Sequence, residues 1–130
     1  MMPAVRTDDR GNAAIALVGG VAMVMVFALG VTDLAVYFLA RTRAQTAADS
    51  AALAAAAELI PGLGAEPEAK AREFANANGA RLLRCTCELG SDVAEVSVAV
   101  PVPRSLLGLS NFGEVNARSR AEVSSPPSAG

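Results

Sequence analysis

The sequence has no histidine or tryptophan, a single tyrosine, and only 18% charged residues. Its only cysteines, Cys85 and Cys87, form one C-x-C pair. A Cys/His nucleophile pair or a zinc cage cannot be assembled from this set, so we predict no catalytic, cofactor-binding or metal-ligating residue and no enzyme activity. The 13 acidic and 11 basic residues give a net charge of −2. Nucleic acid is therefore not an expected partner, because it would require a clustered basic face.

One long uncharged segment decides the class of protein. The 20 residues from Ala13 to Thr32 carry no charge, and as an α-helix they would rise about 30 Å, the thickness of a bilayer's hydrocarbon core. The apolar character resumes after Asp33 and ends at Arg41, so the segment is too long for the core of a cleavable signal sequence. We predict an uncleaved membrane anchor, because so short a chain cannot bury a helix that is apolar on every side.

The helix is expected to continue beyond the membrane. No glycine or proline occurs between Gly30 and Pro61, and strong helix formers fill the interval. We therefore predict one rod from about Asn12 to Ile60, about 73 Å long. Small residues on the rod are predicted to allow close helix packing, namely Ala16 and Gly20 within the span and Ala44, Ala47, Ala48, Ala51 and Ala55 beyond it.

The remainder of the chain has the pattern of a small α+β domain. Proline and glycine mark a linker at 61–67, and a short helix is framed by Pro67 and Gly79, from about Glu66 to Asn78. Three runs of period two follow, and each predicts a strand. The side chains expected on the apolar face are Leu83, Cys85, Cys87 and Leu89 in 82–89, Val96, Val98, Val100 and Val102 in the second run, and Val115, Ala117, Ala121 and Val123 in 114–123.

The predicted fold is pilin-like: a long N-terminal transmembrane helix extended beyond the membrane, then a short helix on the apolar face of a three-stranded antiparallel sheet. Residues 1–11 form a cytoplasmic stub or leader, and residues 12–60 form the helix. Residues 61–123 form the domain. Residues 124–130 are too polar and proline-rich to pack and form a disordered tail.

Cys85 and Cys87 leave three alternatives. A pair of buried thiols is the simplest interpretation. A bridge between residues i and i+2 of an extended strand would be strained, since the Cα atoms would lie near the upper limit of about 6.8 Å. An intermolecular disulfide is the third alternative, if the domain lies outside the membrane.

Asp33 also has two interpretations. An acid inside the hydrocarbon is costly and would indicate a functional pair with a cation on another subunit. Because 13–32 already fills the membrane, we favour a position in the headgroup layer, where the charge costs little.

The pattern of polar residues before and along the helix resembles the sequence pattern of the TadE/TadG-like proteins of Flp-type (tight-adherence) pilus and secretion systems. The resemblance is to a short TadE-like group found in actinobacteria in particular. Residues 10–56 carry most of the resemblance. It implies a minor pilin, a pseudopilin or an assembly component in the membrane, partnered by other pilin-like or secretion-platform proteins. The residues that match the family pattern are Gly11 and Asn12 before the span, then Asp33, Tyr37, Arg41, Arg43, Gln45 and Asp49.

The resemblance also implies processing. In prepilin-like members a membrane aspartic peptidase, the prepilin peptidase, cleaves after the glycine that precedes the apolar helix, which here would be Gly11, leaving Asn12 as the new N-terminus. Prepilins usually carry a glutamate five residues after the cut, and this sequence has Ala16 there. The alternative is an unprocessed single-pass adaptor for a secretion or envelope complex. A secreted effector released within 44–57 is disfavoured, because A-x-A sites are unavoidable in an alanine tract.

The orientation is not decided by charge. Arg6 and Arg10 before the span balance Arg41 and Arg43 after it. Because everything able to fold follows the span, we expect the N-terminal tail in the cytoplasm and the domain outside the inner membrane.

Overall fold

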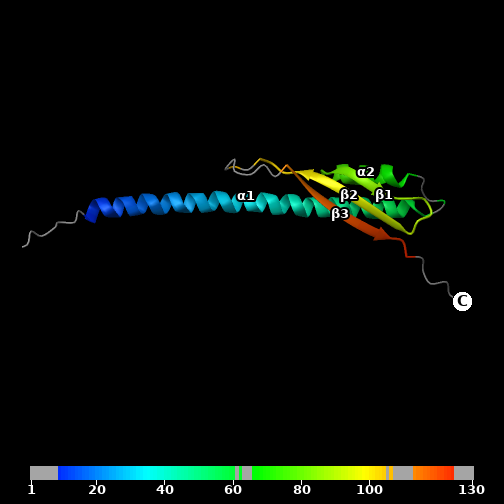
Figure 1. Cartoon of the computed structure of the whole chain (residues 1–130), viewed down its shortest axis with the longest axis horizontal. Helices are drawn as coiled ribbons and strands as arrows, with labels where there is room; N and C mark the ends of the chain where they lie inside the picture. Colours follow the sequence, from blue (N-terminus) through cyan, green and yellow to red (C-terminus); the bar gives the residue numbers. More distant parts are fainter. Residues whose placement is uncertain (1–8, 61, 63–65, 105, 107–112, 125–130) are drawn as a thin grey trace, which may run out of the picture.

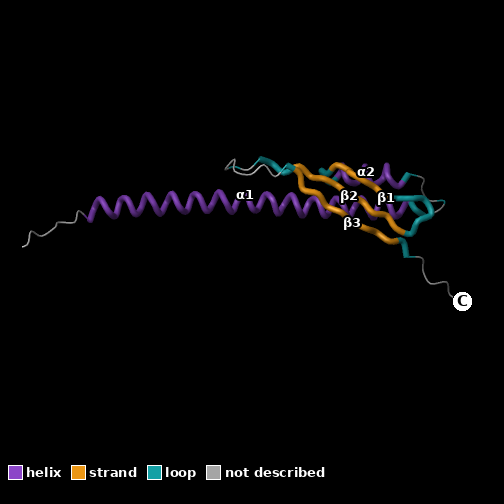
Figure 2. Tube along the Cα trace, in the orientation of Figure 1, coloured by secondary structure: helices purple, strands orange, loops and turns teal. Residues whose placement is uncertain are grey.

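The computed structural model describes residues 9–60, 62, 66–104, 106 and 113–124. Figures 1 and 2 show one long helix with all the other elements gathered around its C-terminal half. The predicted α+β fold is confirmed. Most of the predicted N-terminal stub (1–11) and C-terminal tail (124–130) lies outside the described residues. The elements follow in the order α1 (Asp9–Glu58), α2 (Pro67–Ala77), β1 (Arg81–Thr86), β2 (Val93–Pro101) and β3 (Glu114–Glu122).

Helix α1 is the longest element, with 50 residues in one uninterrupted run. At 1.5 Å per residue it extends about 75 Å, close to the predicted rod. Every residue from Gly11 to Thr32 is exposed, and the helix is long and apolar enough to cross a membrane. Its N-terminal half therefore stands free of the rest of the chain, with large apolar side chains on all sides.

The C-terminal half of α1 forms the centre of the domain. Six of its alanines have no exposed surface, and they let the sheet and α2 approach the helix backbone closely. The prediction that the short helix covers the apolar face of the sheet was wrong, because α1 packs on β2 and β3 while α2 lies along α1 and touches β1. Helix α2 has only 11 residues, too few to cover the strands. The six alanines are Ala44, Ala47, Ala48, Ala51, Ala52 and Ala55.

The sheet is antiparallel with the order β1-β2-β3. The central strand β2 pairs Val96 with Cys85 on one side and Ser119 on the other, and Val98 with Leu82 and Ala117. Val96 and Val98 are the largest completely buried side chains. The predicted apolar faces of the second and third strands are confirmed, since the valines of β2 and the alanines of β3 point toward α1 and belong to the core.

The predicted apolar face of the first strand is confirmed for Cys85 and Cys87, which pack against the core, and was wrong for Leu83 and Leu89. The register of β1 against β2 shifts between Leu82 and Arg84, so Leu83 is an extra residue in a β-bulge. A one-residue shift exchanges the two faces of a strand. Leu82 and Cys85 consequently pack against the core, whereas Leu83 and Leu89, both predicted inward, are exposed.

Because α1 packs closely on the sheet, we expect its buried face to accept only small side chains. Replacing Ala51 with leucine would force extra methylenes between α1 and the sheet and should destabilise the domain by about 1–3 kcal/mol. The matched control is Ala57→Leu, at an exposed position of the same helix. Hydrogen exchange of the β2 amides in the full chain should accelerate for Ala51→Leu only. Equal exchange in the two variants would contradict the packing described.

Candidate functional site

The family-pattern residues form a stripe along one side of α1. Asp33, Tyr37, Arg41, Gln45 and Asp49 recur every four residues, and residues at this spacing lie above one another on a helix. Arg43 is exposed and lies off this stripe. The stripe runs from the end of the apolar segment to the middle of the domain.

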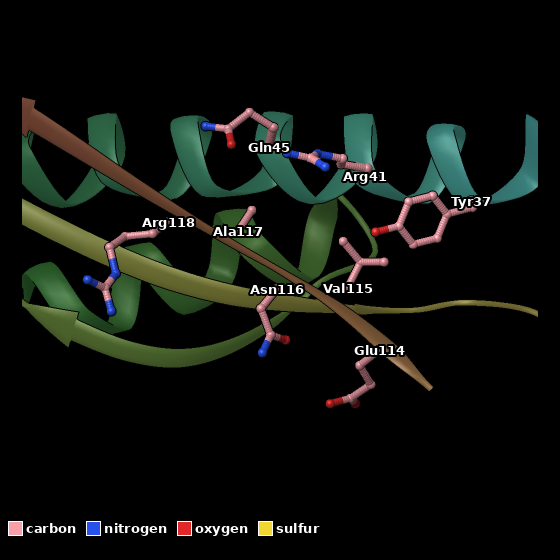
Figure 3. Close-up of a pocket in the computed structure, with 8 residues that line it drawn as sticks. All are labelled: Tyr37, Arg41, Gln45, Glu114, Val115, Asn116, Ala117 and Arg118. Atoms are coloured by element: carbon pink, nitrogen blue, oxygen red, sulfur yellow. The ribbon is translucent and has the colours of Figure 1, made fainter. Parts of the chain in front are cut away.

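The middle of the stripe borders a groove between α1 and β3. Tyr37, Arg41 and Gln45 line one wall, and Glu114 to Arg118 of β3 line the other (Figure 3). The groove has a volume of about 500 Å³. Tyr37 is half-buried and packs against the core, so its ring forms part of the floor where helix and strand converge.

The charged side chains around the groove are held by neighbours. The Gln45 amide donates from Nε2 to Asp49 Oδ1 at 3.0 Å. Across the sheet, Arg81 Nη2 donates to both carboxylate oxygens of Glu114 at 2.9 Å. These pairs are exposed, so each adds little stability and mainly orients the rim.

The groove is lined mainly by polar side chains. They provide two guanidinium groups, two amides, a phenol and a carboxylate. Among the described residues, no group of three or more His, Cys, Asp or Glu side chains could hold a metal ion. The lining side chains can donate and accept hydrogen bonds.

Asp33, at the membrane end of the stripe, is joined to the domain. Its Oδ1 accepts a hydrogen bond from the backbone N–H of Leu106 at 2.9 Å, and its side chain is half-buried. This bond links α1 to the connection between β2 and β3. Asp33 thus lies where the free half of α1 meets the domain.

The structure separates the two sets of predicted packing residues. Ala44, Ala48, Ala51 and Ala55 are buried within the chain's own domain. Ala16 and Gly20 lie on the free half of α1, where they border a shallow apolar hollow with Leu17, Val21 and neighbours. A Cβ atom added at Gly20 would meet no other atom within 4 Å. Only this second set is available to another helix.

Gly11 and Asn12, the predicted cleavage site, lie within the first turn of α1. Both residues are exposed, and a Cβ atom on Gly11 would meet nothing within 4 Å. The bond between them is accessible from solvent at the end of the helix, where the first turn frays most easily.

Cys85 and Cys87 form a disulfide bond with each other, so the interpretation as a pair of buried thiols was wrong. Their Cα atoms are 5.4 Å apart, well inside the range that disulfides adopt. The predicted strain assumed that both residues lie on an extended strand. Strand β1 ends at Thr86, so Cys87 lies outside the extended strand.

These features define a class of protein, an α+β protein with a pilin-like architecture whose long helix is a candidate membrane span. A model of the Tad family, Flp pilus-assembly TadE/G-like, matches residues 11–58, which are α1 almost from end to end. Over this segment the chain carries the TadE/G-like sequence, and the resemblance noted above is confirmed. The match associates the chain with Flp pilus assembly. No curated protein and no solved structure matches the chain.

The bond from Asp33 to Leu106 predicts a local effect of substitution. Asp33→Ala removes the acceptor, so the Leu106 amide should exchange its hydrogen faster in the full chain. Asp49→Ala, at the other end of the stripe, is the control, because Asp49 bonds only within α1 in the contacts described. Hydrogen exchange with mass spectrometry measures both variants. Unchanged exchange at Leu106 in Asp33→Ala would show that the bond does not hold the connection.

Proposed function

We propose that this chain is a pilin-like subunit, a minor pilin or pseudopilin, of a Flp-type pilus or a related secretion system. The observation that carries the proposal is that the family match coincides with a helix of two unlike halves. One half is apolar and exposed on every side, and the other is the core of a folded domain. A helix that is apolar all round requires lipid or other helices around it. The role is assembly and not catalysis.

The free half of α1 supports a single pass through the inner membrane. Residues 11–32 rise about 33 Å, enough to span the hydrocarbon core with a slight tilt. Asp33 and the first residues of the domain would then lie at the membrane surface where the span ends. We place the N-terminal residues in the cytoplasm and the domain outside, where the Cys85–Cys87 disulfide can persist in an oxidising compartment.

Lateral association would use the hollow at Ala16 and Gly20. Small residues spaced by four let two helix backbones approach closely in lipid, where packing replaces the hydrophobic effect as the driving force. The partner is the apolar helix of a second copy or of another pilin-like subunit. The groove between α1 and β3 would then be free to receive a polar segment of a neighbour outside the membrane.

Processing by a prepilin peptidase would cut between Gly11 and Asn12. Ala16 occupies the position at which prepilins usually carry a glutamate, so a charge pair with a neighbour's new N-terminus is not available here. This one residue favours the second candidate, an unprocessed membrane-anchored adaptor for a secretion or envelope complex. Both candidates share the span and the domain and differ at the N-terminus.

The N-terminus of the membrane-bound product distinguishes the two candidates. The chain would be expressed with a C-terminal tag in a host that carries its own prepilin peptidase, and its intact mass and first residue determined. We expect Asn12 as the first residue, and an uncut chain for Gly11→Leu, because the side chain would block the cleavage site. A full-length N-terminus in the unsubstituted chain would contradict the pilin proposal and leave the adaptor.

Helix association makes a separate prediction. Gly20→Leu would fill the hollow and separate the paired backbones, so cross-linking between subunits within the membrane should fall. Gly19→Leu is the matched control, since Gly19 is a neighbouring exposed glycine that does not border the hollow. An equal loss in both variants, or in neither, would show that this face is not the contact.

A further inference from the structure

The connection between β2 and β3 places an exposed apolar side chain beside the end of the membrane span. Leu106 lies in this connection, and its side chain is 69% exposed. Its backbone N–H is held by Asp33 at 2.9 Å. Figure 1 shows the described start of the connection, after β2, reaching past the sheet toward the N-terminal half of α1.

The position of Asp33 relates Leu106 to the bilayer. Residues 13–32 fill the hydrocarbon core, so Asp33 lies at the boundary between acyl chains and headgroups. Leu34, the next residue on α1, is also apolar and 56% exposed. Because Asp33 holds its backbone N–H, Leu106 lies at the depth where the apolar segment of α1 ends.

We propose that Leu106 makes a second contact between the chain and the membrane, with its side chain in lipid at the headgroup boundary. The proposal rests on α1 spanning the membrane, as in the proposed function. The occupant is lipid, because the hydrogen bond to Asp33 holds the exposed Leu106 at the depth where α1 leaves the hydrocarbon.

The local chemistry suits this boundary. Irregular backbone cannot enter hydrocarbon with its polar groups unpaired, and Asp33 accepts the N–H of the residue concerned. Arg104, two residues earlier, is exposed and can extend its guanidinium group to lipid phosphates, as basic residues at membrane boundaries do.

A second contact would restrain the domain in a way that the helix alone does not. A single transmembrane helix is free to rotate about its axis, and rotation and tilt are set by packing and by anchors at the interface. With the Leu106 side chain in the lipid, both the rotation of α1 about its axis and its depth in the bilayer would be restrained. The groove between α1 and β3 would then keep a constant orientation to neighbouring subunits.

The absence of tryptophan from the sequence makes a direct test available. Leu106→Trp gives the full chain a single tryptophan, whose emission and quenching by brominated lipids can be measured in vesicles. The matched control is Leu89→Trp. Leu89 is 63% exposed and lies between β1 and β2, at the end of the sheet opposite the β2–β3 connection. Met23→Trp, at the middle of the span, reports on α1.

We expect the Leu106→Trp emission to be shifted to shorter wavelength and quenched most strongly by lipids brominated near the headgroup. Leu89→Trp should show neither effect, and Met23→Trp should be quenched best by lipids brominated deep in the acyl chains. Emission typical of water at Leu106→Trp, with Met23→Trp quenched, would overturn the second contact and leave the span intact.

Two further outcomes are informative. A blue shift at Leu106→Trp without quenching by any brominated lipid would mean that protein covers the site, which also overturns the proposal. Absence of quenching at Met23→Trp would instead contradict the span on which the proposed function rests.

Discussion

The structure depends on one helix, α1, whose two halves lie in different surroundings. Helix α1 buries small alanines against a sheet at one end and exposes large apolar side chains at the other. Its backbone hydrogen bonds are made within the helix, so the same element can pass from lipid to a folded domain without leaving polar groups unpaired. Among the described elements, none other than α1 is long enough to cover β2 and β3, so the C-terminal half of this helix also serves as the core.

Alanine residues allow one helix to serve as the core of the domain. Large side chains on the buried half of α1 would hold the sheet and α2 away from the helix, whereas alanines bring the valines of β2 close to its backbone. The result is a small domain stabilised by close packing rather than by a large core. The polar stripe from Asp33 to Asp49 borders this packed region, so residues typical of the family lie where helix α1 and strand β3 meet.

The sequence was informative wherever a pattern extended over many residues. The rod, the apolar span, the short helix and the valine face of β2 followed from periodicity and from the distribution of glycine and proline. The bulge at Leu83 was not predictable, because alternation alone assumes a constant register, and one extra residue exchanges the faces. The disulfide was misjudged for a related reason, since the end of β1 at Thr86 decides whether Cys85 and Cys87 can approach. The packing of α1 on the sheet depends on contacts between distant residues, to which local patterns are insensitive.

The central claim is that α1 is one rigid helix from the membrane into the domain. Paired spin labels at Val18 and Leu53, which are 71% and 66% exposed, would measure it directly in lipid nanodiscs with the native disulfide intact. The 35 intervening steps predict a narrow distance distribution centred at about 52 Å between the two backbone positions. A shorter or broad distribution would reveal a hinge between the span and the domain and contradict the account.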